Sequence, residues 1–202
     1  MKSIRGDQRD AADIIKKSLA ADGVVVLPTD TLYGFSTLLS SGKGHKRIGV
    51  LKQSGAERNY LYLASSTAMI KRYIESWGCE SCERFAAIWP APLTAVFRSG
   101  ENCPEWVGET IAFRIPALEF LRSTIEVVGE PVASTSVNSA GESPLGDIVE
   151  IERRFGGDVD LIVTGVAPPG RAPSTLIDFT GRSPVILRKG SYDWDEGVNP
   201  SK

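Results

Sequence analysis

Histidine and cysteine are scarce in this sequence, with one and three copies among 202 residues. No apolar run reaches the 18 or so residues that a membrane-spanning helix requires, and no apolar core follows the polar start at residues 1–7. The net charge of −2 excludes a globally basic nucleic-acid-binding protein, although it leaves room for a local basic cleft. We therefore expect a soluble cytoplasmic protein with no signal peptide and no membrane partner.

The few cysteines give little support for a metal or redox site. Cys79 and Cys82 have the spacing of a zinc knuckle or a redox pair, but a structural zinc ion would need a fourth soft ligand besides Cys103. A redox pair would stand at a helix start just after a strand, whereas the residues before Cys79 are typical of a helix end. We expect three free reduced thiols and no metal site in the protein, with a metal or redox role as the alternative.

Several common catalytic motifs are also absent. There is no phosphate-binding Gly-x-x-x-x-Gly-Lys loop, no Gly-x-Gly-x-x-Gly fingerprint and no Gly-x-Ser-x-Gly nucleophile turn. The single histidine, His45, stands in a segment rich in Gly and Lys, where we expect a solvated loop. The sequence therefore argues against catalysis by a histidine base.

What the sequence does contain is an alternation of helical and extended patterns, which indicates an α/β fold. A chain of this length buries about 70% of its unfolded surface and can form one stable domain. Helices are expected at residues 10–21, 48–52, 67–77, 116–128 and around 148–155. Strands are expected at residues 23–27, 60–64, 93–97, 110–114, 131–134, 161–163, 175–178 and 184–188.

Hydroxyl, amide and basic side chains recur where the expected strands end. They occur at residues 28–34, 52, 90–94, 114–116, 134–138, 173–175 and 188–190. Open α/β sheets bind ligands at such loops, and donors of this kind without a histidine suit the clamping of an anion, above all a phosphate chain. Taken singly, each of these residues is also a common turn or capping residue.

Six of these segments together resemble the YrdC-like family, in the same order and spacing from about residue 23 to residue 190. They are Val-Leu-Pro-Thr-Asp-Thr-Leu-Tyr-Gly at 26–34, Trp-Pro-Ala-Pro-Leu-Thr at 89–94, Phe-Arg-Ile-Pro at 113–116, Ser-Thr-Ser-Val-Asn-Ser-Ala-Gly at 134–141, Pro-Ser-Thr-Leu-Ile-Asp at 173–178 and Ile-Leu-Arg-Lys-Gly at 186–190. The resemblance implies a twisted mixed β-sheet with flanking helices, an open α/β fold with a concave cleft. It also implies a YrdC-like domain at residues 1–190, in the short form without a further C-terminal domain, followed by a polar tail at 191–202 that we expect to be frayed.

The resemblance further implies a reaction. The best-known members of the family are threonylcarbamoyl-AMP synthases, which combine L-threonine, bicarbonate and ATP, with Mg²⁺, to give threonylcarbamoyl-AMP and pyrophosphate. The product serves a downstream tRNA threonylcarbamoyl transferase. Carried over by position, the expected threonine-binding residues are Thr31, Arg114 and Ser174. The expected ATP-binding residues are Lys52, Arg58, Thr94, Ser136, Asn138 and Arg188. Of these, Lys52, Arg114 and Arg188 are the candidate catalytic residues.

The chain departs from the family pattern at two places. The family has Lys-x-Arg where this sequence has Lys52-Gln53-Ser54, and serine supplies neither the charge nor the bidentate geometry of a guanidinium. Arg58 matches a family lysine and retains some of this charge. Ala91 replaces the usual glycine of the Pro-Gly-Pro-Leu-Thr loop and restricts how closely the backbone can approach a phosphate.

These departures leave a second reading open. The chain is either a synthase or a divergent family member that binds double-stranded RNA, tRNA or a nucleotide through its cleft, with weak or altered catalysis. The acidic composition counts against RNA binding, and Ser54 counts against full synthase activity.

Overall fold

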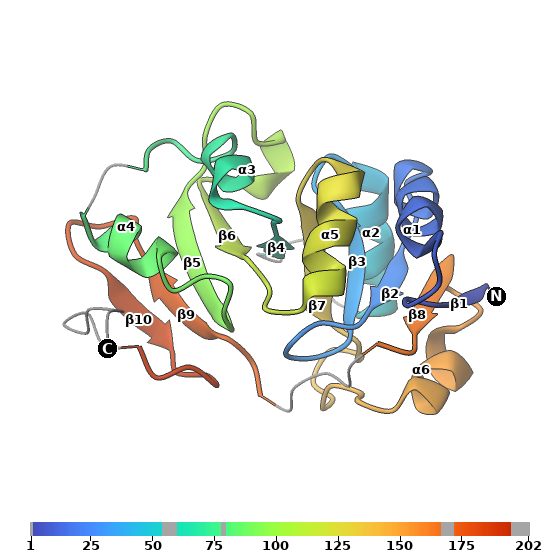
Figure 1. Ribbon diagram of the computed structural model, residues 1–202. Coiled ribbons are helices and arrows are strands. Elements are labelled where there is room, and N and C mark those ends of the chain that lie inside the picture. Colours follow the sequence, from blue (N-terminus) through green and yellow to red (C-terminus); the bar gives the residue numbers. More distant parts are fainter. Residues whose placement is uncertain (1, 54–59, 78–79, 167–171, 195–202) are drawn as a thin grey trace.

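The structure is a computed structural model that describes residues 2–53, 60–77, 80–166 and 172–194. Its centre is a twisted mixed sheet in the order β1-β8-β2-β3-β7-β4-β6-β5-β9-β10 (Figure 1). The strands are β1 (Ser3–Arg5), β2 (Val25–Leu27), β3 (Gly34–Leu38), β4 (Leu61–Leu63), β5 (Leu93–Arg98), β6 (Thr110–Arg114), β7 (Val132–Ser136), β8 (Leu161–Thr164), β9 (Thr175–Asp178) and β10 (Val185–Arg188). The expected fold class, a twisted mixed sheet with flanking helices, is confirmed.

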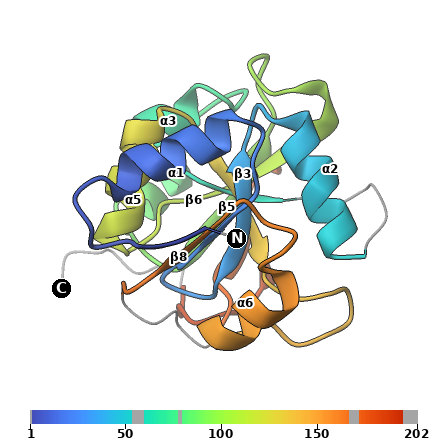
Figure 2. The same cartoon turned by 90° about the vertical axis from the view of Figure 1, so that its right-hand side faces the viewer.

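Helices cover both faces of this sheet. They are α1 (Ala11–Ala20), α2 (Gly42–Leu51), α3 (Thr67–Lys71), α4 (Glu80–Ala86), α5 (Glu119–Val128) and α6 (Ile148–Phe155), with a short 3₁₀ turn at Glu105–Val107. Figure 2 shows α6 on the opposite side of the sheet from α1 and α5. β2 is therefore buried on both faces, which explains why it reads as a continuous apolar run, whereas the edge strand β10 stays exposed.

Two apolar clusters fill the space between helices and sheet. The larger cluster includes Ile15 and Leu19 of α1 and Leu121 and Ile125 of α5. The smaller one joins Ile48 of α2 to residues of α6 and of the facing strands. Neighbouring residues of β2 belong to different clusters because successive side chains of a strand point to opposite faces. Alternate apolar positions thus fix which face of β2 meets which layer.

Three expected elements differ from the observed ones. The expected helix at 67–77 ends at Lys71, because Ile74 forms a bridge with Ser99 and the amide of Glu75 donates to the carbonyl of Arg98 (3.0 Å). Pro116 does not open α5, which begins at Glu119. The expected helix at 48–52 is the end of the longer α2, which Ser41 caps by accepting from the amide of Gly44 (2.9 Å). β1, β3, α4 and the 3₁₀ turn were not expected from the sequence.

His45 is not the solvated loop residue that the sequence predicts. It lies on α2 and is 7% exposed, with Nδ1 2.7 Å from the carbonyl oxygen of Ser41 and Nε2 3.1 Å from the hydroxyl of Tyr62. The Gly-rich segment forms a helix and turns this side chain inward, so the prediction of a solvated loop was wrong. Burial lowers the pKa of His45, and the hydrogen bond to the Ser41 carbonyl acts in the opposite direction.

The cysteines and the tail also differ from expectation. Cys103 is a free thiol, but Cys82 is disulfide-bonded, so the prediction of three free thiols was wrong.

The part of the tail that the structure describes is docked, because Thr175 donates to the carbonyl of Tyr192 and Trp194 packs edge-on against Phe179. No helix in the described ranges is long and apolar enough to cross a membrane.

Candidate active site

A cleft of about 680 Å³ opens where several strands end. Its walls come from the loop between β2 and β3, the ends of β6 and β7, the segment before β9 and the end of β10. The residues that line it are Thr29, Thr31, Leu32, Tyr33, Gly34, Leu61, Arg114, Ser134, Thr135, Ser136, Ser143, Pro144, Pro173, Ser174 and Arg188. Hydroxyl and guanidinium groups predominate among their polar side chains, which suits an anionic or zwitterionic ligand.

Arg114 is held at the last position of β6 by the loop that follows β2. Its guanidinium donates to the hydroxyl of Thr31 (Nη1 to Oγ1, 2.9 Å) and lies 3.2 Å from the carboxylate of Asp30. Thr29 bonds to Thr31 in turn, with 3.0 Å between the hydroxyl oxygens. The other oxygen of Asp30 accepts from the amide of Ala117 (3.0 Å), which holds residues 116–117 away from α5 and explains why that helix begins later than expected.

The Arg114 guanidinium retains an unused donor. The side chain is 2% exposed, and its Nε has no hydrogen-bond partner in the described part of the chain. A buried donor without a partner carries a desolvation cost of about 1–3 kcal/mol that a ligand oxygen would relieve. Burial lowers the pKa of Arg114, Asp30 opposes that shift, and the positive charge of Arg188 adds to it. The two arginines therefore lie close enough to interact across the cleft.

Ser174 connects the second arginine to the sheet. Its hydroxyl lies 2.7 Å from that of Thr94 on β5, and its carbonyl accepts from Arg188 on β10 (Nη2 to O, 3.0 Å). Gly190 allows this approach, because a Cβ there would lie 2.3 Å from the carbonyl carbon of Ser174. Thr94 is buried beneath Ser174 and does not line the cleft, whereas Arg188 and Ser174 do.

Lys52 lies behind the wall of the cleft. Its ammonium group is buried and donates to the carbonyl of Ser136 (2.6 Å), the carbonyl of Asn138 (3.2 Å) and the side-chain oxygen of Asn138 (2.8 Å). Ser136 also donates to that side-chain oxygen (2.6 Å), and the Asn138 amide group donates to the carbonyls of Ser139 and Glu142. Lys52 thus fixes the loop after β7 and presents Ser136 to the cleft.

The site residues predicted from the sequence fall into two groups, those that line the cleft and those that support it. Thr31, Arg114, Ser136, Ser174 and Arg188 line one cleft, while Lys52, Thr94 and Asn138 support it from behind. Arg58 and Ser54 lie outside the described residues.

Asp30 and Tyr33 were not among the site residues expected from the sequence. An acidic residue between two threonines at a strand end was the available signal for Asp30. Tyr33 lines the cleft, and burial raises its pKa, as does the negative charge of Asp147.

The described residues contain no group of three or more His, Cys, Asp or Glu side chains that could hold a metal ion. Asp30, the acidic residue beside the cleft, is already engaged with Arg114 and Ala117. The donor set does not form a protein-built metal cage.

Residues 17–190 match the family model Sua5/YciO/YrdC, whose description is "Telomere recombination". The chain belongs to this family. Because the match spans most of the chain, it includes all the segments that build the cleft, and the recognition made from the six motifs is confirmed.

Named relatives and solved structures agree with this assignment. A threonylcarbamoyl-AMP synthase of Marinobacter nauticus is 28% identical over 170 residues, which is 82% of this chain and 90% of that protein. One from Halorhodospira halophila is 28% identical over 174 residues, which is 85% and 90%. P. abyssi Sua5 complexed with L-threonine superposes with a TM-score of 0.85 at 27% identity, covering 94% of this chain but only 57% of that one. E. coli YciO, with a TM-score of 0.84 at 24% identity and coverage of 98% and 97%, supports the fold alone.

Proposed function

We propose that this family member is a threonylcarbamoyl-AMP synthase whose catalytic domain spans residues 1–190. It would make threonylcarbamoyl-AMP and pyrophosphate from L-threonine, bicarbonate and ATP, and supply the product to a tRNA threonylcarbamoyl transferase. Relatives named as such synthases support the enzyme class. The observation that carries the proposal is the buried Arg114 guanidinium, which lines the cleft and whose Nε has no hydrogen-bond partner among the described residues.

Arg114 is suited to bind the carboxylate of threonine. A guanidinium binds a carboxylate through two parallel hydrogen bonds, and Nε is one of the donors that this arrangement uses. Asp30 and Thr31 already hold the group in place, so little orientation is lost when the ligand arrives. Ser174, which lines the same cleft, supplies a hydroxyl, and the complex of a relative with L-threonine supports the choice of amino acid.

Arg188 and the Ser136 loop are suited to bind ATP. Arg188 adds a second positive charge to the cleft, and Lys52 fixes the loop that presents the Ser136 hydroxyl. Mg²⁺ would enter as part of the MgATP substrate, since it is commonly held by substrate phosphates rather than by an all-protein cage. Lys52, Thr94 and Asn138 would then act by positioning, and Arg188 and Ser136 by contact.

The chemistry follows from this placement. The neutral threonine amine gives a carbamate either by attacking carbon dioxide, with release of one proton, or by attacking bicarbonate, with release of water that carries the amine proton. A carbamate oxygen then attacks the α-phosphorus, and the bond to the β-phosphate oxygen breaks to release pyrophosphate. Arg114 fixes the amino acid, and Arg188 stabilises negative charge on the phosphate oxygens, so the chain contributes orientation and electrostatics.

The test is synthesis from labelled bicarbonate, with threonine and ATP omitted in turn. We expect labelled threonylcarbamoyl-AMP only when both are present, and loss of synthesis in Arg114→Gln. Arg5→Gln, which alters an arginine paired at the surface with Asp7, is the matched control and should keep its activity. A folded wild-type protein that binds ATP and forms no product would favour the divergent, non-synthase reading.

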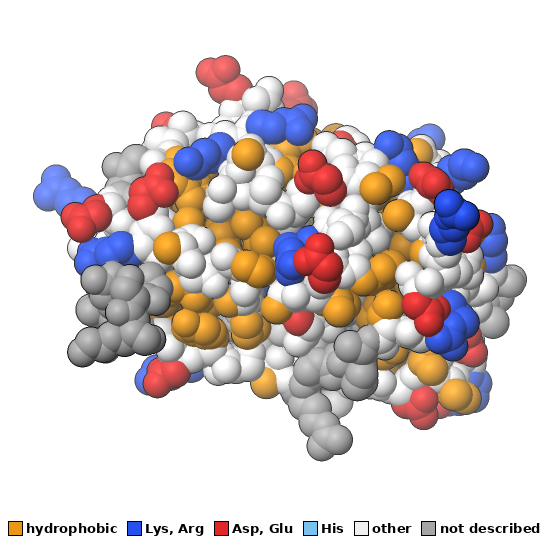
Figure 3. Space-filling view, viewed as in Figure 1, with side chains coloured by type: hydrophobic (Ala, Val, Ile, Leu, Met, Phe, Trp, Pro, Cys, Tyr) orange, Lys and Arg blue, Asp and Glu red, His pale blue; other side chains and the backbone are white. Residues whose placement is uncertain are grey.

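RNA binding is the other outcome to examine. On the face shown in Figure 3, positive and negative side chains are interspersed, so that face offers no continuous basic surface for a phosphate backbone. In the divergent reading, RNA affinity would come from the cleft. It should then disappear in Arg188→Ala and compete with ATP.

A further inference from the structure

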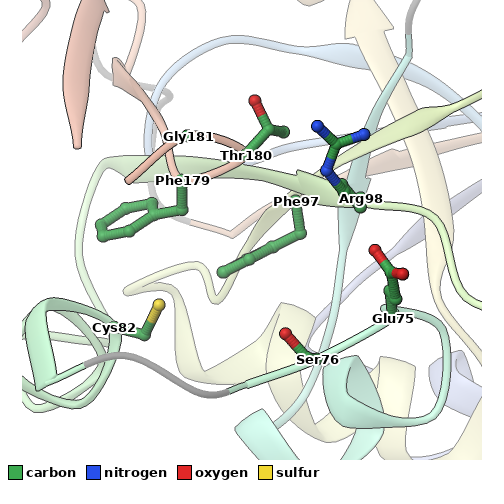
Figure 4. A pocket seen from close by; sticks show the side chains of 8 residues that line it. All are labelled: Glu75, Ser76, Cys82, Phe97, Arg98, Phe179, Thr180 and Gly181. Atoms are coloured by element: carbon green, nitrogen blue, oxygen red, sulfur yellow. The ribbon is translucent and has the colours of Figure 1, made fainter. Parts of the chain in front are cut away.

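A second cavity lies at the other end of the two strands that support the cleft. The cleft uses the start of β5 and β9, where Thr94 meets Ser174, whereas this cavity adjoins Arg98 and Phe179 at their far ends. It measures about 390 Å³, and the residues around it are drawn in Figure 4. Because β5 and β9 run parallel for four residue pairs, the two cavities are separated by the length of a strand.

One wall of this second cavity is aromatic. The rings of Phe97 and Phe179 are stacked, with centroids 5.8 Å apart and planes 20° from parallel, and Trp77 supports Phe97 from another side with centroids 5.4 Å apart. Phe97 is nearly buried, whereas Phe179 is partly exposed. Phe179 also packs edge-on against Phe85 (centroids 5.0 Å apart) and Trp194 (6.5 Å), so a flat group can pack only on the part of the ring that remains exposed at the cavity edge.

Two opposite charges stand at the mouth. Arg98 and Glu75 are exposed neighbours, because the amide of Glu75 donates to the carbonyl of Arg98 (3.0 Å). Neither side chain forms an ion pair or a hydrogen bond with any other residue that the structure describes. Figure 4 shows both on one side of the cavity, with the Phe179 ring on the other and the hydroxyls of Ser76 and Thr180 between the two regions.

We propose that this cavity binds a free α-amino acid with an aromatic side chain. The carboxylate would meet Arg98, the ammonium group would meet Glu75, and the ring would pack against Phe179. A free amino acid carries both charges on one carbon atom, whereas an internal peptide residue carries neither. A nucleotide would also fit the aromatic wall, and its phosphate could meet Arg98, but it has no ammonium group to pair with Glu75. The inference does not depend on the proposed synthase activity, since it uses none of the residues that line the cleft.

L-Phenylalanine is the probe, and the amide NMR signals of Ser76, Thr180 and Gly181 are the readout. We expect these signals to shift saturably, with a dissociation constant on the order of 1 mM for a ligand of this size. N-acetyl-L-phenylalanine amide, which lacks both charges, and glycine, which lacks the ring, should each bind more weakly by about threefold or more. Saturating L-threonine, which the cleft would take, should leave phenylalanine binding unchanged.

Exposed residues allow variants that preserve the fold. Arg98→Gln and Glu75→Gln should each weaken phenylalanine binding about threefold to fivefold, and Arg9→Gln, distant in the sequence and also exposed, should not. Arg114→Gln should bind phenylalanine normally, which separates this cavity from the cleft. Three outcomes would overturn the proposal: no saturable shift, competition by threonine, or tighter binding of AMP than of phenylalanine at the same signals.

Discussion

The carboxylate of Asp30 lies 3.2 Å from the guanidinium of Arg114, with exposed side-chain fractions of 11% and 2%. In every other ion pair between described residues, at least one side chain is 42% exposed or more. A buried arginine without a countercharge would strongly destabilise the folded protein. Asp30 supplies that countercharge and so allows a charged donor to lie beneath the cleft. Asp30 also leaves the Nε of Arg114 unused. The pair therefore holds a charged group in place and still leaves it able to bind.

Asp30→Asn should impair threonine use more than ATP use. The substitution keeps the shape of the side chain and removes the charge that holds Arg114. A hydrogen bond to a charged group is worth about 1.5–3 kcal/mol, so the KM for threonine should rise roughly tenfold to a hundredfold. Steady-state kinetics with each substrate varied in turn gives the answer. Asp7→Asn, which breaks an exposed pair with Arg5, is the control and should change neither KM. An equal rise in both would mean that Asp30 supports the fold as a whole.

Lys52→Met should lower both stability and ATP affinity. The ammonium group bonds to Ser136 and Asn138, so the variant leaves buried acceptors unpaired at a cost of about 1–3 kcal/mol. The loop that presents Ser136 should then loosen. Urea unfolding and ATP titration on the same sample measure the two effects. Loss of ATP affinity with unchanged stability would instead indicate direct contact between Lys52 and the phosphates.

Arg188→Ala should lower ATP affinity without lowering stability. Its guanidinium bonds only to the carbonyl of Ser174 among the described residues, and β10 buries none of its side chains. We expect the free energy of unfolding to change by no more than about 0.5 kcal/mol, with ATP affinity lowered roughly tenfold or more. Calorimetric titration with ATP and urea unfolding provide the measurements. Unchanged ATP affinity would remove Arg188 from the nucleotide site.

His45 should make stability depend on pH below neutrality. Burial lowers its pKa below the ordinary value of 6.5, so the unfolded chain takes up a proton near pH 6.5 while the folded protein does not. This contribution to the free energy of unfolding is complete above pH 6.5 and is lost as the pH falls from there towards the folded pKa. His45→Gln should therefore destabilise the protein at pH 7.5 and do so less at pH 5. A constant difference across that range would contradict the assignment.

Ser54→Arg tests the departure from the family pattern. If the missing guanidinium weakens catalysis, restoring it should raise kcat/KM about tenfold to a hundredfold. If Arg58 already supplies the charge, the gain should be small in the wild type and larger in an Arg58→Ala background, because the two residues would substitute for each other. Synthesis from labelled bicarbonate measures all four proteins. A folded Ser54→Arg protein that makes no product in either background would end the synthase proposal.

The sequence was most informative where local pattern and packing agree. α1 and β2 were both predicted correctly, because the residues that each element buries are apolar and their spacing shows the type of element. The start of α5 and the end of α3 were predicted wrongly, because contacts distant in the chain decide those boundaries. Asp30 decides the first, and the end of β5 with Ser99 decides the second.

In the candidate site, too, local motifs were predicted correctly and contacts between distant segments were not. The motifs predicted which residues occur near the ligand, and five of them line one cleft. They did not predict that Lys52 and Asn138 bond to each other behind it, or that Asp30 pairs with Arg114. Those relationships depend on which strands become neighbours, and β6 is separated from the loop after β2 by about eighty residues of sequence.

The position of β10 at the edge of the sheet has a consequence for dynamics. This strand pairs only with β9, has a register shift, and exposes all four of its side chains. Few buried contacts resist its separation from the sheet, so its amide hydrogens should exchange with solvent faster than those of β6, which lies inside the sheet. Each such opening would carry Arg188 away from Arg114. The two positively charged sides of the cleft would then part and rejoin through local unfolding at the edge of the sheet, with the interior strands undisturbed.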